Sequence, residues 1–183
     1  MNMKSFYATA LVASALSLAA IAAEPKGWTD NYTQAVAKAK AEKKYVLLDF
    51  TGSDWCGFCK VLDKEVFSTP HFESWAKKNV VLVTVDFPHQ TPLSAQVKKQ
   101  NSELMSKYPT RGFPTIVITD ADGKELAKET GYQPGTGAVA YVQKLETELK
   151  KNGPLPGETN GGSSSAGGTQ EPSIFKTPPA GTK

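Results

Sequence analysis

Apolar residues in the middle of the chain follow two spacings, one typical of buried strands and one typical of helices. Residues 45–50, 80–85 and 116–119 are nearly continuous apolar runs, which predict strands covered on both faces. Residues 125–130 follow an Asp/Gly turn and are expected to form an antiparallel edge strand. Apolar residues at helical spacing predict helical segments over 30–43, 56–67, 70–79, 91–108 and 136–152.

Residues that favour helix starts stand at the beginning of several of these segments. Thr29 or Asp30 can cap the first one, and Pro70 suits the first position of a helix, where its missing N–H needs no partner. Thr91 and Pro92 are expected to begin the 91–108 helix in the same way. The resulting order of helices and strands predicts an α/β fold, with a central mixed sheet of about four to five strands and helices on both faces.

The two ends of the chain differ in composition from the middle. Residues 1–23 contain one lysine, an apolar run and a small-residue cleavage pattern, which together predict a signal peptide. The alternative is an uncleaved membrane anchor, but the apolar run is shorter than the roughly 20 residues of a membrane span. No later segment is long and apolar enough to span a membrane either, so no span is expected after cleavage. Residues 153–183 are rich in Gly, Pro, Ser and Thr and predict a disordered tail. One domain remains, over residues 24–152, and a periplasmic or secreted protein is expected.

The charge of the chain excludes one class of partner. The formal net charge is +3, and it falls to +2 when Lys4, the one charged residue of the signal, is removed. So small an excess gives no electrostatic reason to expect nucleic-acid binding. No segment has the pattern of a dimerisation helix, so a monomer is expected.

The candidate chemistry lies directly after the first apolar run, at Trp55-Cys56-Gly57-Phe58-Cys59-Lys60. These are the only two cysteines of the protein. If Cys56 begins a helix, its sulfur faces unpaired backbone N–H groups and the positive end of the helix dipole, which stabilise a thiolate. Cys59 would lie on the same side of the first turn, where it can attack a mixed disulfide at Cys56. The spacing therefore predicts a two-step thiol–disulfide exchange.

A metal site is a weaker interpretation of the two cysteines. Structural zinc takes four ligands, and the only histidines are His71 and His89. Both are expected to be ordinary surface residues, so no metal ligands are assigned. No external cofactor is expected either, because a dithiol itself carries two electrons.

Three separated features make residues 31–149 resemble the thioredoxin family. They are the Trp-Cys-x-x-Cys-Lys block, an acidic residue in the preceding strand at Asp49, and the block Tyr-x-x-Arg-Gly-x-Pro-Thr at 108–115. The resemblance implies the thioredoxin fold. The Gly-Phe dipeptide between the cysteines and the long segment 87–107 resemble secreted bacterial thioredoxin-like proteins.

The resemblance also implies roles for residues outside the cysteine motif. Asp49 resembles the family's buried carboxylate, which removes a proton from the second cysteine, although it lies seven residues before Cys56, one more than in typical thioredoxins. Pro114 is expected to be a cis-proline facing the cysteines. The residues expected to contact substrate are Trp55, Gly57, Phe58, Phe113, Pro114, Thr115 and Gly131.

Two functions are compatible with these residues. The first is a thiol–disulfide oxidoreductase that exchanges disulfides with protein substrates outside the cytoplasm and is recycled by a redox partner. The second is a non-enzymatic binding module in which Cys56 and Cys59 form a structural disulfide, as oxidising compartments favour. The sequence leaves the direction of electron flow open.

Overall fold

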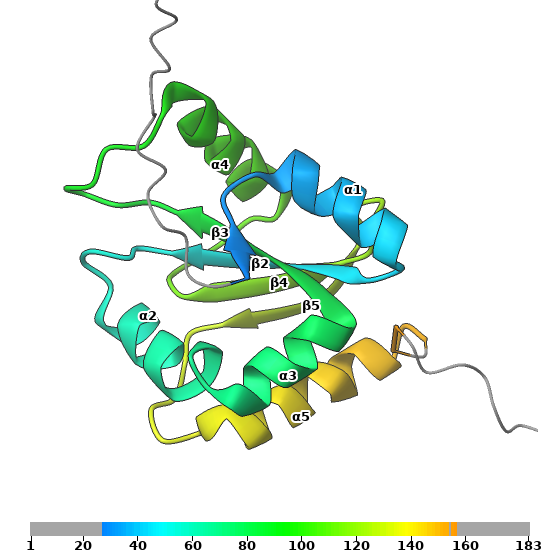
Figure 1. Ribbon diagram of the computed structural model, residues 1–183. Coiled ribbons are helices and arrows are strands. Elements are labelled where there is room, and N and C mark those ends of the chain that lie inside the picture. The colour runs from blue at the N-terminus through cyan, green and yellow to red at the C-terminus, as the bar shows by residue number, and fades with distance from the viewer. Residues whose placement is uncertain (1–26, 154, 157–183) are drawn as a thin grey trace, which may run out of the picture.

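The computed structural model describes residues 27–153, 155 and 156. Its centre is a five-stranded sheet with the strand order β1-β3-β2-β4-β5 (Figure 1). The strands are β1 (Trp28–Thr29), β2 (Tyr45–Thr51), β3 (Val80–Asp86), β4 (Thr115–Thr119) and β5 (Glu125–Thr130). Strands β1, β3 and β2 run parallel, whereas β4 is antiparallel to β2 and to β5. The sheet is therefore mixed, as the sequence predicts.

Helices cover both faces of this sheet (Figure 1). The helices are α1 (Tyr32–Glu42), α2 (Gly57–Leu62), a π-helical turn η1 (Asp63–Phe67), α3 (Pro70–Asn79), α4 (Ala95–Lys107) and α5 (Gly137–Lys150). One buried cluster joins the sheet to α1 and α4, and a second joins it to α2, η1, α3 and α5. The two layers of helices confirm the α/β thioredoxin fold.

Alternation along β2 determines which face each of its side chains reaches. Leu48 and Phe50 belong to the cluster under α1 and α4, whereas Leu47 belongs to the cluster under α2, α3 and α5. Asp49 is two residues after Leu47, so its side chain lies on the same face of the sheet as that of Leu47. The strand therefore directs the Asp49 carboxyl toward the helix that carries the cysteines.

Three boundaries differ from the sequence predictions. Strand β1 is not among the expected elements, because two residues are too few to show a periodicity. Helix α1 is capped by Asn31, whose side chain accepts from the Gln34 N–H at 2.9 Å, and not by Thr29 or Asp30. The prediction for Thr91 and Pro92 is also wrong, because α4 begins at Ala95 and takes Ser94 as its cap.

The predicted signal peptide lies outside the described residues, and so does nearly all of the predicted tail. Within the part of the chain that the structure describes, no helix is long and apolar enough to cross a membrane.

Candidate functional site

Cys56 and Cys59 form a disulfide at the start of α2. The chain leaves β2 through a tight turn in which the Cys56 N–H donates to the Gly52 carbonyl at 2.8 Å. Cys56 is the cap of α2, and its Sγ accepts from the Cys59 N–H at 3.2 Å. The structure thus places the Cys56 sulfur at the N–H end of the helix, where the sequence predicts it, and both side chains are almost fully buried.

Asp49 lies behind this disulfide. The residue as a whole is half-buried, but its Oδ1 atom is buried and accepts no hydrogen bond within the described part of the chain. Asp49 and Cys59 line one cavity of about 300 Å³, together with Lys60, Asp63 and residues of β2 and β3. The extra residue before the cysteines is absorbed in the 52–55 turn, so the carboxyl still reaches the space beside Cys59.

The environment of Asp49 favours its neutral form. Burial is the largest cause, and the negative charges of Asp63 and Asp86 act in the same direction; together they raise the pKa of the carboxyl from 3.8 to about 8. A carboxyl group with a pKa near neutral pH can both accept and release a proton under ordinary conditions. The geometry therefore suits proton exchange with Cys59.

The Phe113–Pro114 peptide bond is cis, which confirms the predicted geometry of that bond. Gly131, directly after β5, has a φ of 78° and donates its N–H to the Pro114 carbonyl at 2.8 Å. A glycine suits this position because side chains rarely adopt such a backbone angle. Thr115 is buried within β4, and its hydroxyl donates to the Gly112 carbonyl at 2.7 Å.

Two aromatic side chains flank the cysteines on the surface. Trp55 is 41% exposed and Phe58 is 56% exposed, which is unusual for residues of this size in a folded domain. Gly57 is exposed between Cys56 and Phe58. The Trp55 ring also meets the edge of Phe113, with ring centroids 5.6 Å apart. The cysteine motif and the cis-proline segment therefore form one continuous surface.

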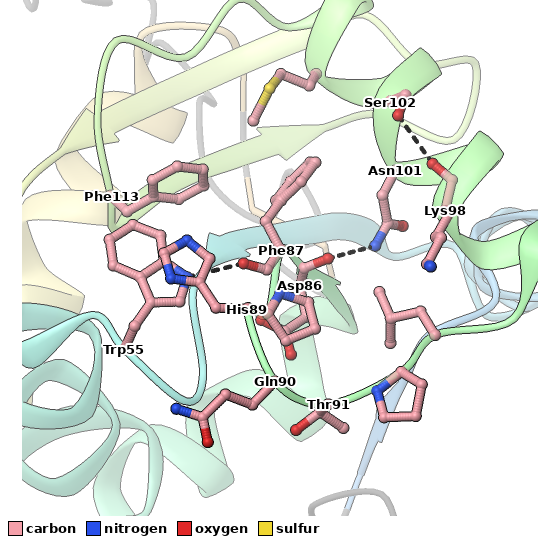
Figure 2. Close-up of a pocket in the computed structure, with 14 residues that line it drawn as sticks. Trp55, Asp86, Phe87, His89, Gln90, Thr91, Lys98, Asn101, Ser102 and Phe113 are labelled. Atoms are coloured by element: carbon pink, nitrogen blue, oxygen red, sulfur yellow. Dashed lines mark hydrogen bonds between the residues drawn. The ribbon is translucent and has the colours of Figure 1, made fainter.

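Several residues of this surface were not identified from the sequence. His89 is exposed, as expected, but its ring stacks on the Trp55 indole with a centroid distance of 4.7 Å (Figure 2). The Trp55 Nε1–H donates to the Phe87 carbonyl at 2.8 Å. These two contacts come from the segment after β3, whose partners no local sequence pattern reveals.

Beside Trp55 the segment after β3 and helix α4 enclose a groove of about 730 Å³ (Figure 2). Its lining includes Phe87, Leu93, Met105 and Phe113, so much of the wall is apolar. No group of three or more His, Cys, Asp or Glu side chains within the described residues has an arrangement that could hold a metal ion.

The chain is similar in sequence to two curated bacterial proteins and in fold to one solved structure. It is 38% identical over 130 residues to the disulfide bond reductase DsbH of Chlamydia pneumoniae, covering 71% of this chain and 76% of that protein. It is 27% identical to the thioredoxin-related protein DsbJ of the same organism, over 70% of this chain but only 38% of that protein. A solved structure described as DsbH oxidoreductase superposes with a TM-score of 0.64 at 33% identity, over 79% of this chain and 95% of that one.

The fold, the Cys56–Cys59 pair and these relatives define the protein as a thiol–disulfide oxidoreductase. Residues 32–146 match the family model described as a thioredoxin-like domain, and the chain belongs to that family.

Proposed function

We propose that the protein is exported from the cytoplasm and reduces disulfide bonds in protein substrates, with Cys56 as the attacking thiolate and Cys59 as the resolving thiol. One observation carries the assignment of Cys56 as the attacking thiolate: the Cys56 Sγ caps α2 and accepts from the Cys59 N–H at 3.2 Å. That N–H donor and the helix dipole stabilise negative charge on the sulfur of the reduced protein.

The reaction begins with the reduced dithiol. The Cys56 thiolate attacks one sulfur of the substrate disulfide, forms a mixed disulfide with it and releases the other substrate sulfur as a thiolate. The Cys59 thiolate then attacks the Cys56 sulfur, which forms the Cys56–Cys59 disulfide and releases the second substrate sulfur. Two electrons pass from the protein to the substrate. The protein ends in the state that the structure shows.

In the second step, in which Cys59 attacks the mixed disulfide, the Asp49 carboxylate accepts the Cys59 proton. Its carboxyl shares a cavity with Cys59, and its Oδ1 has no hydrogen-bond donor from the described residues. Because Cys59 is almost fully buried, solvent has poor access to its proton. The ionised Asp49 carboxylate takes that proton, and Cys59 becomes the nucleophile that resolves the mixed disulfide.

The substrate contacts the exposed surface around Cys56. Phe58 and Trp55 provide apolar area, and the Gly57 backbone leaves room for an approaching chain, because a Cβ there would meet nothing within 4 Å. Phe113 and Pro114 provide the opposite side, and Gly131 holds the Pro114 carbonyl. Thr115 is buried, so it takes part through its backbone alone.

The direction of electron flow is proposed from the relatives. The curated protein that is 38% identical is named a disulfide bond reductase, which favours reduction over oxidation. A reductase needs a dithiol donor that reduces Cys56–Cys59 after each cycle, so we propose such a redox partner. We further propose a periplasmic or secreted monomer, on the basis of the signal-like residues 1–23.

A turnover assay tests the proposal. With dithiothreitol as the electron donor, the mature protein is expected to accelerate the reduction of insulin, and Cys56→Ser is expected to abolish that acceleration. Wild-type protein that leaves the rate unchanged would support the alternative of a binding module with a structural disulfide.

A further inference from the structure

The carboxylate of Asp54 binds a loop that lies far away in the sequence. Its Oδ1 accepts from the His89 N–H at 3.0 Å, and its Oδ2 accepts from the Gln90 and Thr91 N–H groups at 2.7 and 3.2 Å. These donors lower the pKa of the Asp54 carboxyl, with His89 contributing most. Three charge-assisted bonds from consecutive residues fix the backbone of that loop against the turn before Cys56.

The bound loop in turn holds the Trp55 side chain from two directions. The Phe87 carbonyl accepts from the indole Nε1–H, and the His89 ring lies parallel to the indole, with 7° between the planes (Figure 2). The Trp55 ring also makes an edge-on contact with Phe113, which in turn packs against Phe87. Trp55, the loop and the cis-proline segment are thus joined by direct contacts.

We propose that Asp54 is a positioning residue for substrate recognition: its carboxylate fixes the 87–91 loop, and that loop fixes Trp55 and Phe113 beside Cys56. The proposal rests on the proposed function, since it concerns the surface that receives the substrate. Asp54 touches neither reacting sulfur, so the intrinsic reactivity of the dithiol does not depend on it. Its loss affects only substrates large enough to contact the Trp55 surface.

The test compares a protein substrate with a small one. In Asp54→Asn the amide cannot accept from all three N–H groups, so we expect the KM for insulin to rise at least about fivefold, with kcat nearly unchanged. The rate with hydroxyethyl disulfide, which is too small to cover Trp55, should stay within twofold of wild type. Asp54→Glu keeps the charge and should recover part of the effect. Asp122→Asn removes an equal charge from the exposed β4–β5 turn. It should change neither the KM for insulin nor the rate with hydroxyethyl disulfide.

A spectroscopic readout separates this role from a general structural one. In proton–nitrogen NMR spectra, the amide signals of His89, Gln90 and Thr91 and the Trp55 indole signal should shift in Asp54→Asn, while signals of β4 and β5 stay in place. In wild type, the three amide signals should move together as acid protonates Asp54.

Each outcome decides the proposal. An unchanged indole signal together with an unchanged KM for insulin would overturn it, and so would an equal loss of rate with both substrates. If the wild-type protein reduces neither disulfide, the proposed function fails, while the NMR shifts still decide whether Asp54 positions the loop and Trp55.

Discussion

The Asp49 carboxyl group and the Cys59 side chain line the same cavity, although they come from β2 and α2. Alternation along β2 gives the carboxyl its direction, and the 52–55 turn brings α2 back over it. The Oδ1 atom is buried and has no hydrogen-bond donor among the described residues, which favours the neutral form of the carboxyl. This placement affects both the resolution of the mixed disulfide by Cys59 and the pH dependence of the free energy of unfolding.

Asp49→Asn should slow the release of substrate from the mixed disulfide. An amide cannot accept the Cys59 proton, so kcat for insulin reduction should fall by about a hundredfold at pH 7, at the lower end of the range for loss of a general base. The rate at which iodoacetamide alkylates Cys56 in the reduced protein measures the first nucleophile and should change much less. Equal losses in both measurements would contradict the role in the second step.

The same variant should change how stability depends on pH. Folding raises the Asp49 pKa from 3.8 to about 8, so the unfolded chain releases this proton first as pH rises. The contribution of Asp49 to the free energy of unfolding is therefore highest below pH 3.8 and falls as pH rises to about 8.

Urea unfolding of the oxidised protein at several pH values measures this effect. In Asp49→Asn, the decline of the free energy of unfolding between pH 5 and pH 7 should be smaller, by up to about 1.4 kcal/mol per pH unit. Identical pH slopes in the two proteins would show that Asp49 is ionised in the folded state.

Cys59→Ser should accumulate mixed disulfides at Cys56. The variant retains the nucleophile but lacks the thiol that resolves the intermediate, so the substrate stays attached. Non-reducing electrophoresis followed by mass spectrometry would detect the adduct, and Cys56→Ser provides the matched control that should form none. Adducts on the control, or none on Cys59→Ser, would contradict the assigned order of attack.

Gly52→Ala should displace Trp55. A Cβ at Gly52 would lie 2.3 Å from the indole ring, which the Phe87, His89 and Phe113 contacts prevent from moving freely. The expected cost is about 1–3 kcal/mol in the free energy of unfolding, as for overpacking elsewhere. Chemical denaturation and the Trp55 indole NMR signal measure it. Gly112→Ala is the matched control, because a Cβ there would meet nothing within 4 Å.

The sequence predicts those parts of the fold that are long or periodic. The strands at 45–50 and 80–85 and the helix from Pro70 are found within a residue or two of their expected bounds, because burial on both faces and a proline at the first helical position leave strong local signals. Cys56 at a helix start and the cis bond before Pro114 are confirmed as well.

Contacts between distant segments are what local patterns do not reveal. Thr91 and Pro92 have the composition of a helix start, but the Thr91 N–H donates to Asp54, and α4 begins only at Ala95. The π-helical turn at 63–67 likewise has no periodicity of its own. At Thr91 a tertiary hydrogen bond overrides a weak local preference.

The reduction potential of the Cys56–Cys59 pair tests the central claim most directly. The mature protein would be equilibrated with redox buffers of known potential, and the fraction of free thiols would be measured by mass spectrometry after alkylation. A reductase predicts a value near roughly −270 mV, that of thioredoxin. A value near about −120 mV would indicate an oxidant, and one well below about −300 mV a structural disulfide; either would contradict the proposed reduction of protein substrates.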